Sequence, residues 1–142
     1  MIIEKYNADS IVITADKYEK TLGSLDASYD AWTEVKNIDI TPQRVETSKY
    51  DLIFLGSPIW WYRPSVPLWT FALNNDFKDK DVILFNTFNS KFKQNYIDEF
   101  ENIITSKGGR LKKHIYVRRG RWYEQLTSEE LLEQFSRLLD KL

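Results

Sequence analysis

The sequence has no cysteine and only one histidine, His114, among its 142 residues. Without cysteine there is no disulfide, no thiol nucleophile and no cysteine-ligated metal. A single histidine excludes a multi-histidine metal site and argues against a histidine-centred catalytic triad. The acidic residues are scattered and form no evident acid–base pair. We therefore expect neither a metal site nor a catalytic side chain.

An excess of one charge and long apolar runs are also missing. The net charge is −1 and the pI about 5.9, so the chain lacks the overall basic character of a nucleic-acid-binding domain. No apolar segment approaches the ~20 residues that span a bilayer. The amino terminus has no basic region followed by an apolar core. We expect a cytoplasmic protein with neither nucleic acid nor membrane as partner.

The composition does suffice for a folded core. Hydrophobic residues make up 42% of the chain and charged residues 29%, which is ordinary for a globular protein. The length fits one domain, and no linker, internal repeat or low-complexity segment divides the chain. We therefore treat residues 1–142 as a single domain.

The chain is organised around an apolar run at residues 51–55, followed by Gly56-Ser57-Pro58. An apolar run without polar alternation is typical of a parallel strand that is covered on both faces. Glycine and proline predict that the strand ends there and a loop begins. That loop carries Trp60, Trp61 and Tyr62. Three consecutive aromatic side chains cannot all enter one core, so at least one should remain for a surface or a ligand.

The rest of the sequence alternates strand and helix patterns. Strands are predicted at residues 10–14, 81–85 and 111–117, and helices at residues 1–7, 66–75, 92–106 and after 127. Residues 16–37 suggest an irregular excursion, with a turn at Gly23-Ser24 and one helical turn near residues 28–35. Thr127 with Glu130 matches a capping box. The alternation predicts an α/β layer fold with right-handed crossovers.

Two segments resemble a known family. Residues 50–61, YDLIFLGSPIWW, together with LWTF at 68–71, resemble the third strand and following loop of the flavodoxin-like family. Residues 76–87, DFKDKDVILFNT, are similar to its fourth strand and the next loop. The resemblance extends over most of the chain. It implies a three-layer α/β sandwich with a mainly parallel sheet and non-covalent binding of flavin mononucleotide (FMN).

The resemblance also implies where the flavin would bind. In the family, an aromatic residue of the third-strand loop lies against the flavin ring, a role carried here to Trp60 or Trp61. The loop after the fourth strand contacts the ring edge. The candidate cofactor-binding residues are Ser57, Pro58, Ile59, Trp60, Trp61, Asn86, Thr87, Phe88 and Asn89. The structural alternative for the two tryptophans is packing over helices or in a partner interface. For the loop after the fourth strand, the alternative is a plain strand-to-helix connection.

One part of the family pattern has no counterpart. Residues 4–14 resemble the end of the first helix and the second strand, so the first strand and the phosphate-binding loop are missing and we expect an N-terminally truncated fold. That strand would lie inside a sheet of order 2-1-3-4-5. The strands at 10–14 and 51–55 must then pair directly, accept a strand from another chain, or leave unsatisfied edges.

Two functions follow from these observations. The first is an FMN-dependent redox protein, either an electron carrier or the flavin domain of a small oxidoreductase. Its partner would be a redox protein or a nicotinamide-dependent donor. The alternative is a non-catalytic remnant that has lost FMN binding and acts through homodimerisation or another partner.

Three further features each allow a structural and a functional interpretation. The basic stretch at residues 107–121 could steer an acidic redox partner or bind a phosphate, although such runs are usually solvated faces. Arg63 could pair with a phosphate or stack on an aromatic ring. His114 lies in a predicted strand, where a structural role is expected.

Overall fold

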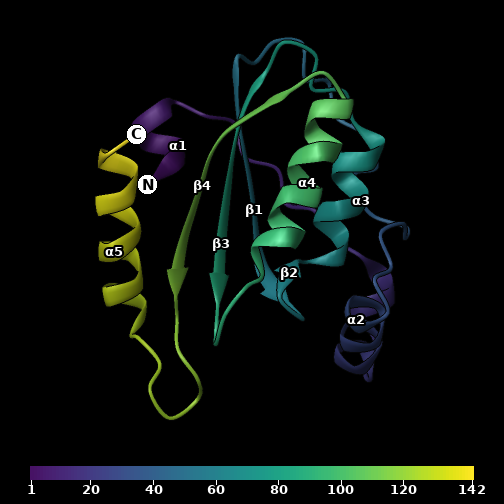
Figure 1. The fold of residues 1–142 in the computed structure, drawn as a ribbon, viewed down its shortest axis with the longest axis vertical. Coiled ribbons are helices and arrows are strands. Elements are labelled where there is room, and N and C mark those ends of the chain that lie inside the picture. Colours follow the sequence, from purple (N-terminus) through teal and green to yellow (C-terminus); the bar gives the residue numbers. More distant parts are fainter.

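The computed structural model describes all 142 residues and contains one four-stranded sheet (Figure 1). The strand order is β2-β1-β3-β4. β1 and β3 are parallel, as are β3 and β4, whereas β2 is a short antiparallel return beside the end of β1. The strands are β1 (Leu52–Trp60), β2 (Arg63–Pro64), β3 (Asp81–Phe88) and β4 (Arg110–Arg118).

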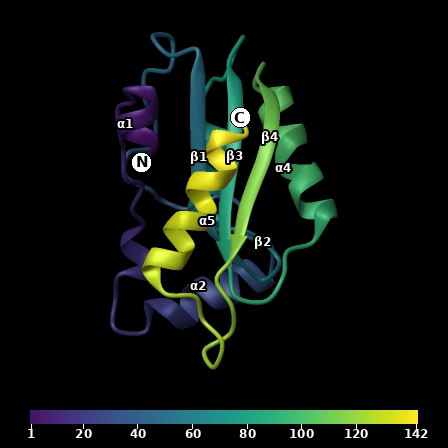
Figure 2. The same ribbon diagram turned by 90° about the vertical axis from the view of Figure 1, so that its left-hand side faces the viewer.

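Helices cover both faces of this sheet (Figures 1 and 2). α3 and α4 lie on one face, α5 and α1 lie on the other, and α2 lies near the carboxyl ends of the strands. No helix combines the length and the apolar character that a membrane crossing requires. The helices are α1 (Ile2–Tyr6), the 3-10 turn η1 (Asp16–Tyr18), α2 (Gly23–Trp32), α3 (Val66–Asn74), α4 (Gln94–Ser106) and α5 (Ser128–Asp140). The predicted three-layer α/β fold is confirmed.

The two faces of the central strands have separate apolar cores. Val82 and Leu84 of β3 belong to the larger cluster, which packs under α3 and α4. Ile83 and the partly buried Phe85 belong to the smaller cluster, which packs under α5. Successive strand residues point to opposite faces, so an apolar run fills both cores at once. This is why β1 and β3 show no polar alternation.

The sequence signals for the starts of α5 and α3 were accurate. Thr127 accepts a hydrogen bond from the Glu130 amide, and the Glu130 side chain accepts one from the Thr127 amide. The predicted capping box is therefore confirmed at the start of α5. α3 begins at Val66 with Pro67 in its first turn, where the absent amide hydrogen breaks no helical bond.

The strand predicted at residues 10–14 does not form. Residues 9–13 make no backbone hydrogen bond, and only Thr14 forms an isolated antiparallel bridge, with Thr41. A β-branched run needs a partner strand to become part of a sheet, and here no partner lies beside it. The sheet therefore ends at β1, whose outer edge is unpaired from Leu52 up to the place where β2 begins.

The predicted strand ends were also wrong. β1 continues through Ser57 and Pro58 to Trp60, and β3 continues to Phe88. The Pro58 carbonyl accepts a bond from the Ser65 amide, so residue 58 faces away from β3 and its missing amide hydrogen costs no bond with that strand. Gly56 is needed for close packing rather than for a turn, because a Cβ there would lie 1.9 Å from the Phe85 ring.

The predicted excursion contains a full helix. α2 begins at Gly23, where the sequence suggested only a turn, and it ends at Trp32 rather than near residue 35. A Cβ on Gly23 would lie 2.0 Å from the Tyr18 carbonyl oxygen, so this glycine lets the helix start pack on η1. Gly23, like Gly56, is therefore needed for close packing against a neighbouring residue and does not mark a turn.

Candidate functional site at the carboxyl edge of the sheet

The loops at the carboxyl ends of the three parallel strands form one continuous surface. The Lys93 amide donates to the Tyr62 carbonyl at 2.9 Å, which joins the loop after β3 to the turn after β1. The Arg119 amide donates to the Phe88 carbonyl at 2.7 Å, which joins the segment after β4 to β3. Ligands of open α/β sheets bind at this edge.

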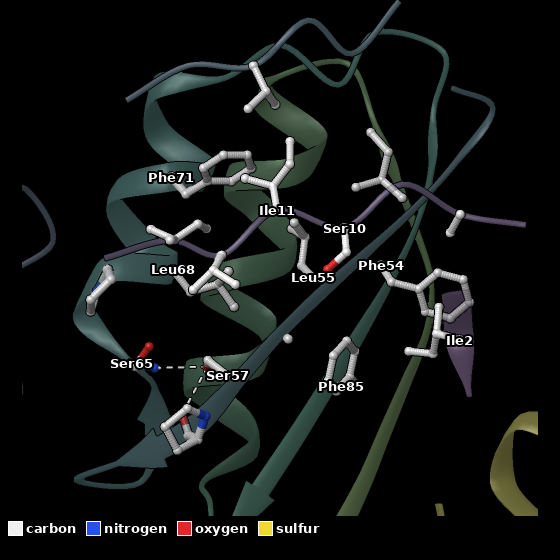
Figure 3. A pocket seen from close by; sticks show the side chains of 18 of the residues that line it. Ile2, Ser10, Ile11, Phe54, Leu55, Ser57, Ser65, Leu68, Phe71 and Phe85 are labelled. Carbon is white, nitrogen blue, oxygen red and sulfur yellow. Dashed lines mark hydrogen bonds between the residues drawn. The ribbon is translucent and has the colours of Figure 1, made fainter. Parts of the chain in front are cut away.

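A large cavity lies along the unpaired edge of β1 (Figure 3). Its volume is about 760 Å³, and 21 of its 31 lining residues are hydrophobic. Leu55, Leu68 and Phe71 line one side, whereas Phe54 and Phe85 line the other (Figure 3). The amino-terminal segment closes the cavity opposite β1, where Ser10 and Ile11 lie. The cavity occupies the space that a strand between this segment and β1 would fill.

Trp60 stands at the carboxyl end of this cavity. Its ring meets Tyr18 edge to face, with ring centroids 5.6 Å apart and an interplanar angle of 80°. Ser57, Pro58 and Ser65 line the same end. Together these residues form a partly aromatic pocket end with two hydroxyl groups, an arrangement that suits a flat ring with polar edges.

A buried polar network connects β1 with the two strands beyond it. Asn86 is fully buried, and its Nδ2 donates to the Ser57 carbonyl at 2.8 Å. Its Oδ1 lies 2.8 Å from His114 Nε2, so that histidine nitrogen carries the proton and donates. Burial lowers the pKa of His114 to about 4, which keeps the ring neutral. His114 therefore has the structural role that the sequence suggested.

Trp61 points to a different hollow from Trp60. Its indole Nε1 donates to Ser28 Oγ at 2.8 Å, and the residue is 47% exposed, which fulfils the expectation that one aromatic remains at the surface. Trp61 and Tyr62 both have a positive φ, 47° and 69°, in the turn from β1 to β2. Non-glycine residues rarely adopt that conformation, and they do so often at ligand-binding sites.

This second hollow has a volume of about 220 Å³. It lies between the turn after β1 and the end of β3 and is lined by Ile59, Trp61, Tyr62, Phe88, Asn89, Ser90 and Lys91. The candidate residues are thus divided. Ser57, Pro58 and Trp60 line the large cavity, and Ile59, Trp61, Phe88 and Asn89 line the small one. Asn86 and Thr87 line neither.

Ser65 and Tyr18, which line the large cavity near Trp60, were not among the candidates. Ser65 precedes α3 directly, and a serine before a predicted helix is a recognisable start signal. Tyr18 lies in the segment predicted to be irregular, and no sequence pattern marks it. Burial and the hydrogen bond to Asp30, 2.8 Å long, raise the pKa of Tyr18. Asp30 is buried and also pairs with Lys17 at 2.6 Å, which fixes η1 against α2 beneath Trp60.

Basic side chains collect around the carboxyl edge. The Nζ atoms of Lys93 and Lys91 lie 4.6 and 5.5 Å from the Tyr62 ring centroid. Arg118 donates to the Ser90 carbonyl and pairs with Glu124 at 2.6 Å. None of these basic residues lines the large cavity, whose charged lining residues are Asp9 and Glu19.

Arg63 is almost completely buried beneath this edge. Its guanidinium lies 4.9 Å from the Tyr96 ring centroid, so it stacks on an aromatic ring, one of the two roles considered for it. Its Nη2 lies 3.5 Å from Glu34. Its Nε and Nη1 have no hydrogen-bond partner.

Comparison with known proteins identifies the family. Residues 19–125 match the profile of the flavodoxin family. The match covers most of the chain, including β1, β3, β4 and the loops that follow them. The chain belongs to the flavodoxin family.

Solved structures agree with this assignment at the level of the fold. A candidate flavoprotein from Bacteroides uniformis ATCC 8492 matches with a TM-score of 0.55 and 21% identity, over 85% of this chain and 70% of its own. A candidate flavoprotein from Bacteroides eggerthii DSM 20697 matches with a TM-score of 0.52 and 18% identity, over 94% of this chain and 77% of its own. A flavoprotein in complex with FMN from Lactobacillus acidophilus NCFM matches with a TM-score of 0.50 and 21% identity, over 68% of this chain and 64% of its own. The chain thus spans about two thirds to three quarters of their lengths. No curated protein matches significantly.

Proposed function

We propose that this chain binds FMN without a covalent bond and acts as a redox protein, either an electron carrier or the flavin domain of a small oxidoreductase. Membership of the flavodoxin family supports the proposal, as does the FMN bound to the related protein from Lactobacillus acidophilus. The single observation that carries it is the position of Trp60 at the carboxyl end of a 760 Å³ cavity. The flavin, when bound, would supply the electron chemistry.

The residues at this end suit the isoalloxazine ring. Trp60 and Tyr18 offer apolar aromatic surface, and Ser57 and Ser65 offer polar groups at its edge. A cavity of this volume lies within the range of about 300–1,000 Å³ that is usual for ligand sites. An aromatic wall excludes water from a bound ring and adds stacking energy.

The same cavity does not suit a phosphate. Its charged lining side chains, Asp9 and Glu19, are both acidic, and no lysine or arginine lines it. The Ser65 amide at the start of α3 already donates to the Pro58 carbonyl and to Ser57 Oγ. The proposed binding therefore depends on the ring, and the phosphate of FMN should contribute little to affinity.

Titration of the purified chain with FMN, followed by quenching of flavin fluorescence, tests the proposal. The Trp60→Ala variant should bind about 5- to 150-fold more weakly, because stacking on an aromatic side chain contributes roughly 1–3 kcal/mol. Trp122→Ala is the matched control, since Trp122 is 86% exposed and lines neither cavity. Equal effects of the two substitutions, or no quenching by the unchanged protein, would contradict the proposal.

The basic edge indicates the kind of redox partner. Lys91, Lys93, Arg119 and Arg121 are exposed on the side of the smaller hollow, and Glu124 in the same region is already paired with Arg118. Such a surface attracts an acidic partner and speeds association at low salt. We therefore propose an acidic redox protein, or the phosphates of a nicotinamide nucleotide, as the donor. Electron transfer to this chain should then slow as ionic strength rises.

A further inference from the structure

α2 turns its large apolar side chains toward solvent. Its buried side consists of small residues and one acid, namely Gly23, Ala27, Asp30 and Ala31. Its outer side carries four large apolar side chains that are 61–64% exposed, Leu22 at the N-cap followed by Leu25, Tyr29 and Trp32. A surface helix ordinarily buries its apolar stripe and exposes its charged residues. Packing within this chain therefore does not account for these four side chains.

This exposed stripe lies apart from both hollows of the carboxyl edge. None of its four residues lines the 760 Å³ cavity or the 220 Å³ hollow. α2 lies at the periphery of the fold, next to α3 (Figure 1). Beside the stripe, Trp61 is 47% exposed and is held by the hydrogen bond from its Nε1 to Ser28 Oγ. We call the stripe and this tryptophan the α2 patch, which consists of Leu22, Leu25, Tyr29, Trp32 and Trp61.

The α2 patch is large enough to form the centre of an interface. Its side chains expose roughly 600–700 Å² in total. The largest apolar patch on an ordinary monomer measures about 300–600 Å² and is often functional. Specific protein interfaces bury about 600–1,000 Å² on each partner. The patch thus supplies most of the area that a stable dimer needs, without any change in the fold.

The spacing of the stripe makes it complementary to itself. Its residues are separated by intervals of three, four and three positions, which read the same in both directions along the helix. In an antiparallel pair of α2 helices, Leu22 therefore lies opposite Trp32 of the second copy, and Leu25 lies opposite Tyr29. Each of these contacts joins a smaller side chain to a larger one, which favours close packing. A twofold interface forms each contact twice, because residue i meets j and j meets i.

The charges of α2 favour a second copy over a basic partner. The helix contains no lysine or arginine and two acids. Asp30 is buried and pairs with Lys17 at 2.6 Å, so only Asp26 remains exposed beside the stripe. One exposed carboxylate offers little to a basic partner, since surface ion pairs contribute at most about 1 kcal/mol. An apolar stripe is best covered by another apolar stripe.

We propose that the α2 patch binds a second copy of this chain, with the two α2 helices antiparallel and a twofold axis beside Ala27. This position lies midway between Leu25 and Tyr29. The same pairing brings the two copies of Asp26 to one side of the interface, where they repel each other weakly. The proposal does not rest on flavin binding, and the experiments below contain no flavin. Failure of dimerisation and failure of flavin binding can therefore be told apart.

Sedimentation equilibrium of the unchanged protein between about 1 and 500 µM tests the proposal. It should show a monomer–dimer equilibrium in this range. Tyr29→Lys should raise the dissociation constant at least about tenfold, because it places a charge in the apolar interface twice. Tyr123→Lys is the matched control and should change it little, since Tyr123 is 61% exposed and Tyr29 62%. A monomer over the whole range, or equal weakening by both variants, would overturn the proposal.

The salt dependence of the dimer separates the α2 patch from the basic carboxyl edge. An apolar interface whose nearest charges repel should hold equally well or better as ionic strength rises. A contact between the basic edge and acidic residues of another copy would weaken instead. A dimer that salt dissociates would therefore contradict an interface at α2.

Disulfide cross-linking tests the antiparallel register directly, because the chain has no cysteine of its own. Opposite positions in the proposed pair lie within the Cα separation of about 4.4–6.8 Å that a disulfide spans. On oxidation, a mixture of the Leu25→Cys and Tyr29→Cys proteins should therefore form a covalent heterodimer, identified by its mass. A mixture of Leu22→Cys and Leu25→Cys is the control and should form at least about fivefold less, since these positions are not opposite each other. Equal yields from the two mixtures would overturn the proposal.

Discussion

His114 should make the stability of this protein depend on pH in a range where no other side chain ordinarily titrates. It is the only histidine, and burial lowers its pKa from 6.5 to about 4. Between these two values the unfolded chain binds a proton that the folded chain does not, so acid favours unfolding. The stabilisation by neutral His114 is complete above pH 6.5 and is lost progressively as the pH falls toward 4.

The size of this effect follows from the same values. At about 1.4 kcal/mol per unit of pKa, the full shift would correspond to ~3 kcal/mol. The ring is partly exposed, and solvent screening reduces this to ~1–2 kcal/mol. About 1 kcal/mol of it should be lost between pH 7 and pH 5. The carboxyl groups with lowered pKa, Asp9, Glu46 and Glu124, contribute only near and below their ordinary values of 3.8 and 4.5.

Urea unfolding at pH 7, 6 and 5 measures this loss. The His114→Gln variant is the comparison, because glutamine keeps an amide donor that can face Asn86 but has no proton to bind in this range. The unchanged protein should lose about 1 kcal/mol from pH 7 to pH 5, and the variant should lose almost none. The same slope in both proteins would refute the reasoning, because the pH dependence would then come from groups other than His114.

Three further changes test how the fold holds the candidate site. Gly56→Ala should lower the free energy of unfolding by about 1–3 kcal/mol through overpacking against Phe85, and Phe85→Ala should relieve most of that loss in thermal unfolding of the double variant. Trp61→Gly should be more stable than Trp61→Ala by about 1 kcal/mol in urea, because only glycine accepts a positive φ without cost. Thr127→Ala should cost about 1 kcal/mol, and helix content at the start of α5 should decrease in circular dichroism.

The sequence predicted those elements whose signals are local. The capping box at Thr127 needs only two residues three positions apart, and the apolar runs of β1 and β3 follow from burial on both faces. The segment at residues 10–14 has the composition of a strand but lacks a neighbour to pair with, and sequence periodicity cannot show whether a partner is present. The end of β1 was misjudged because Pro58 faces away from β3, so its missing amide hydrogen breaks no bond between the two strands.

The candidate site was harder to predict than the fold. The expectation that one of three consecutive aromatics stays at the surface was correct for Trp61. Asn86 looked like a polar loop residue, but it is buried between Ser57 and His114, two residues that lie 29 and 28 positions away in the chain. Only the register of three strands brings these groups together. Which residues contact a flavin stays a prediction.

The central claim is that this chain recognises the flavin ring and not the phosphate. Parallel titrations with FMN and riboflavin, each followed by flavin fluorescence, test it most directly. The two dissociation constants should agree within about threefold, because no lysine or arginine lines the cavity. FMN binding more than tenfold tighter than riboflavin would show that the chain holds the phosphate, and binding of neither would contradict a flavin site at Trp60.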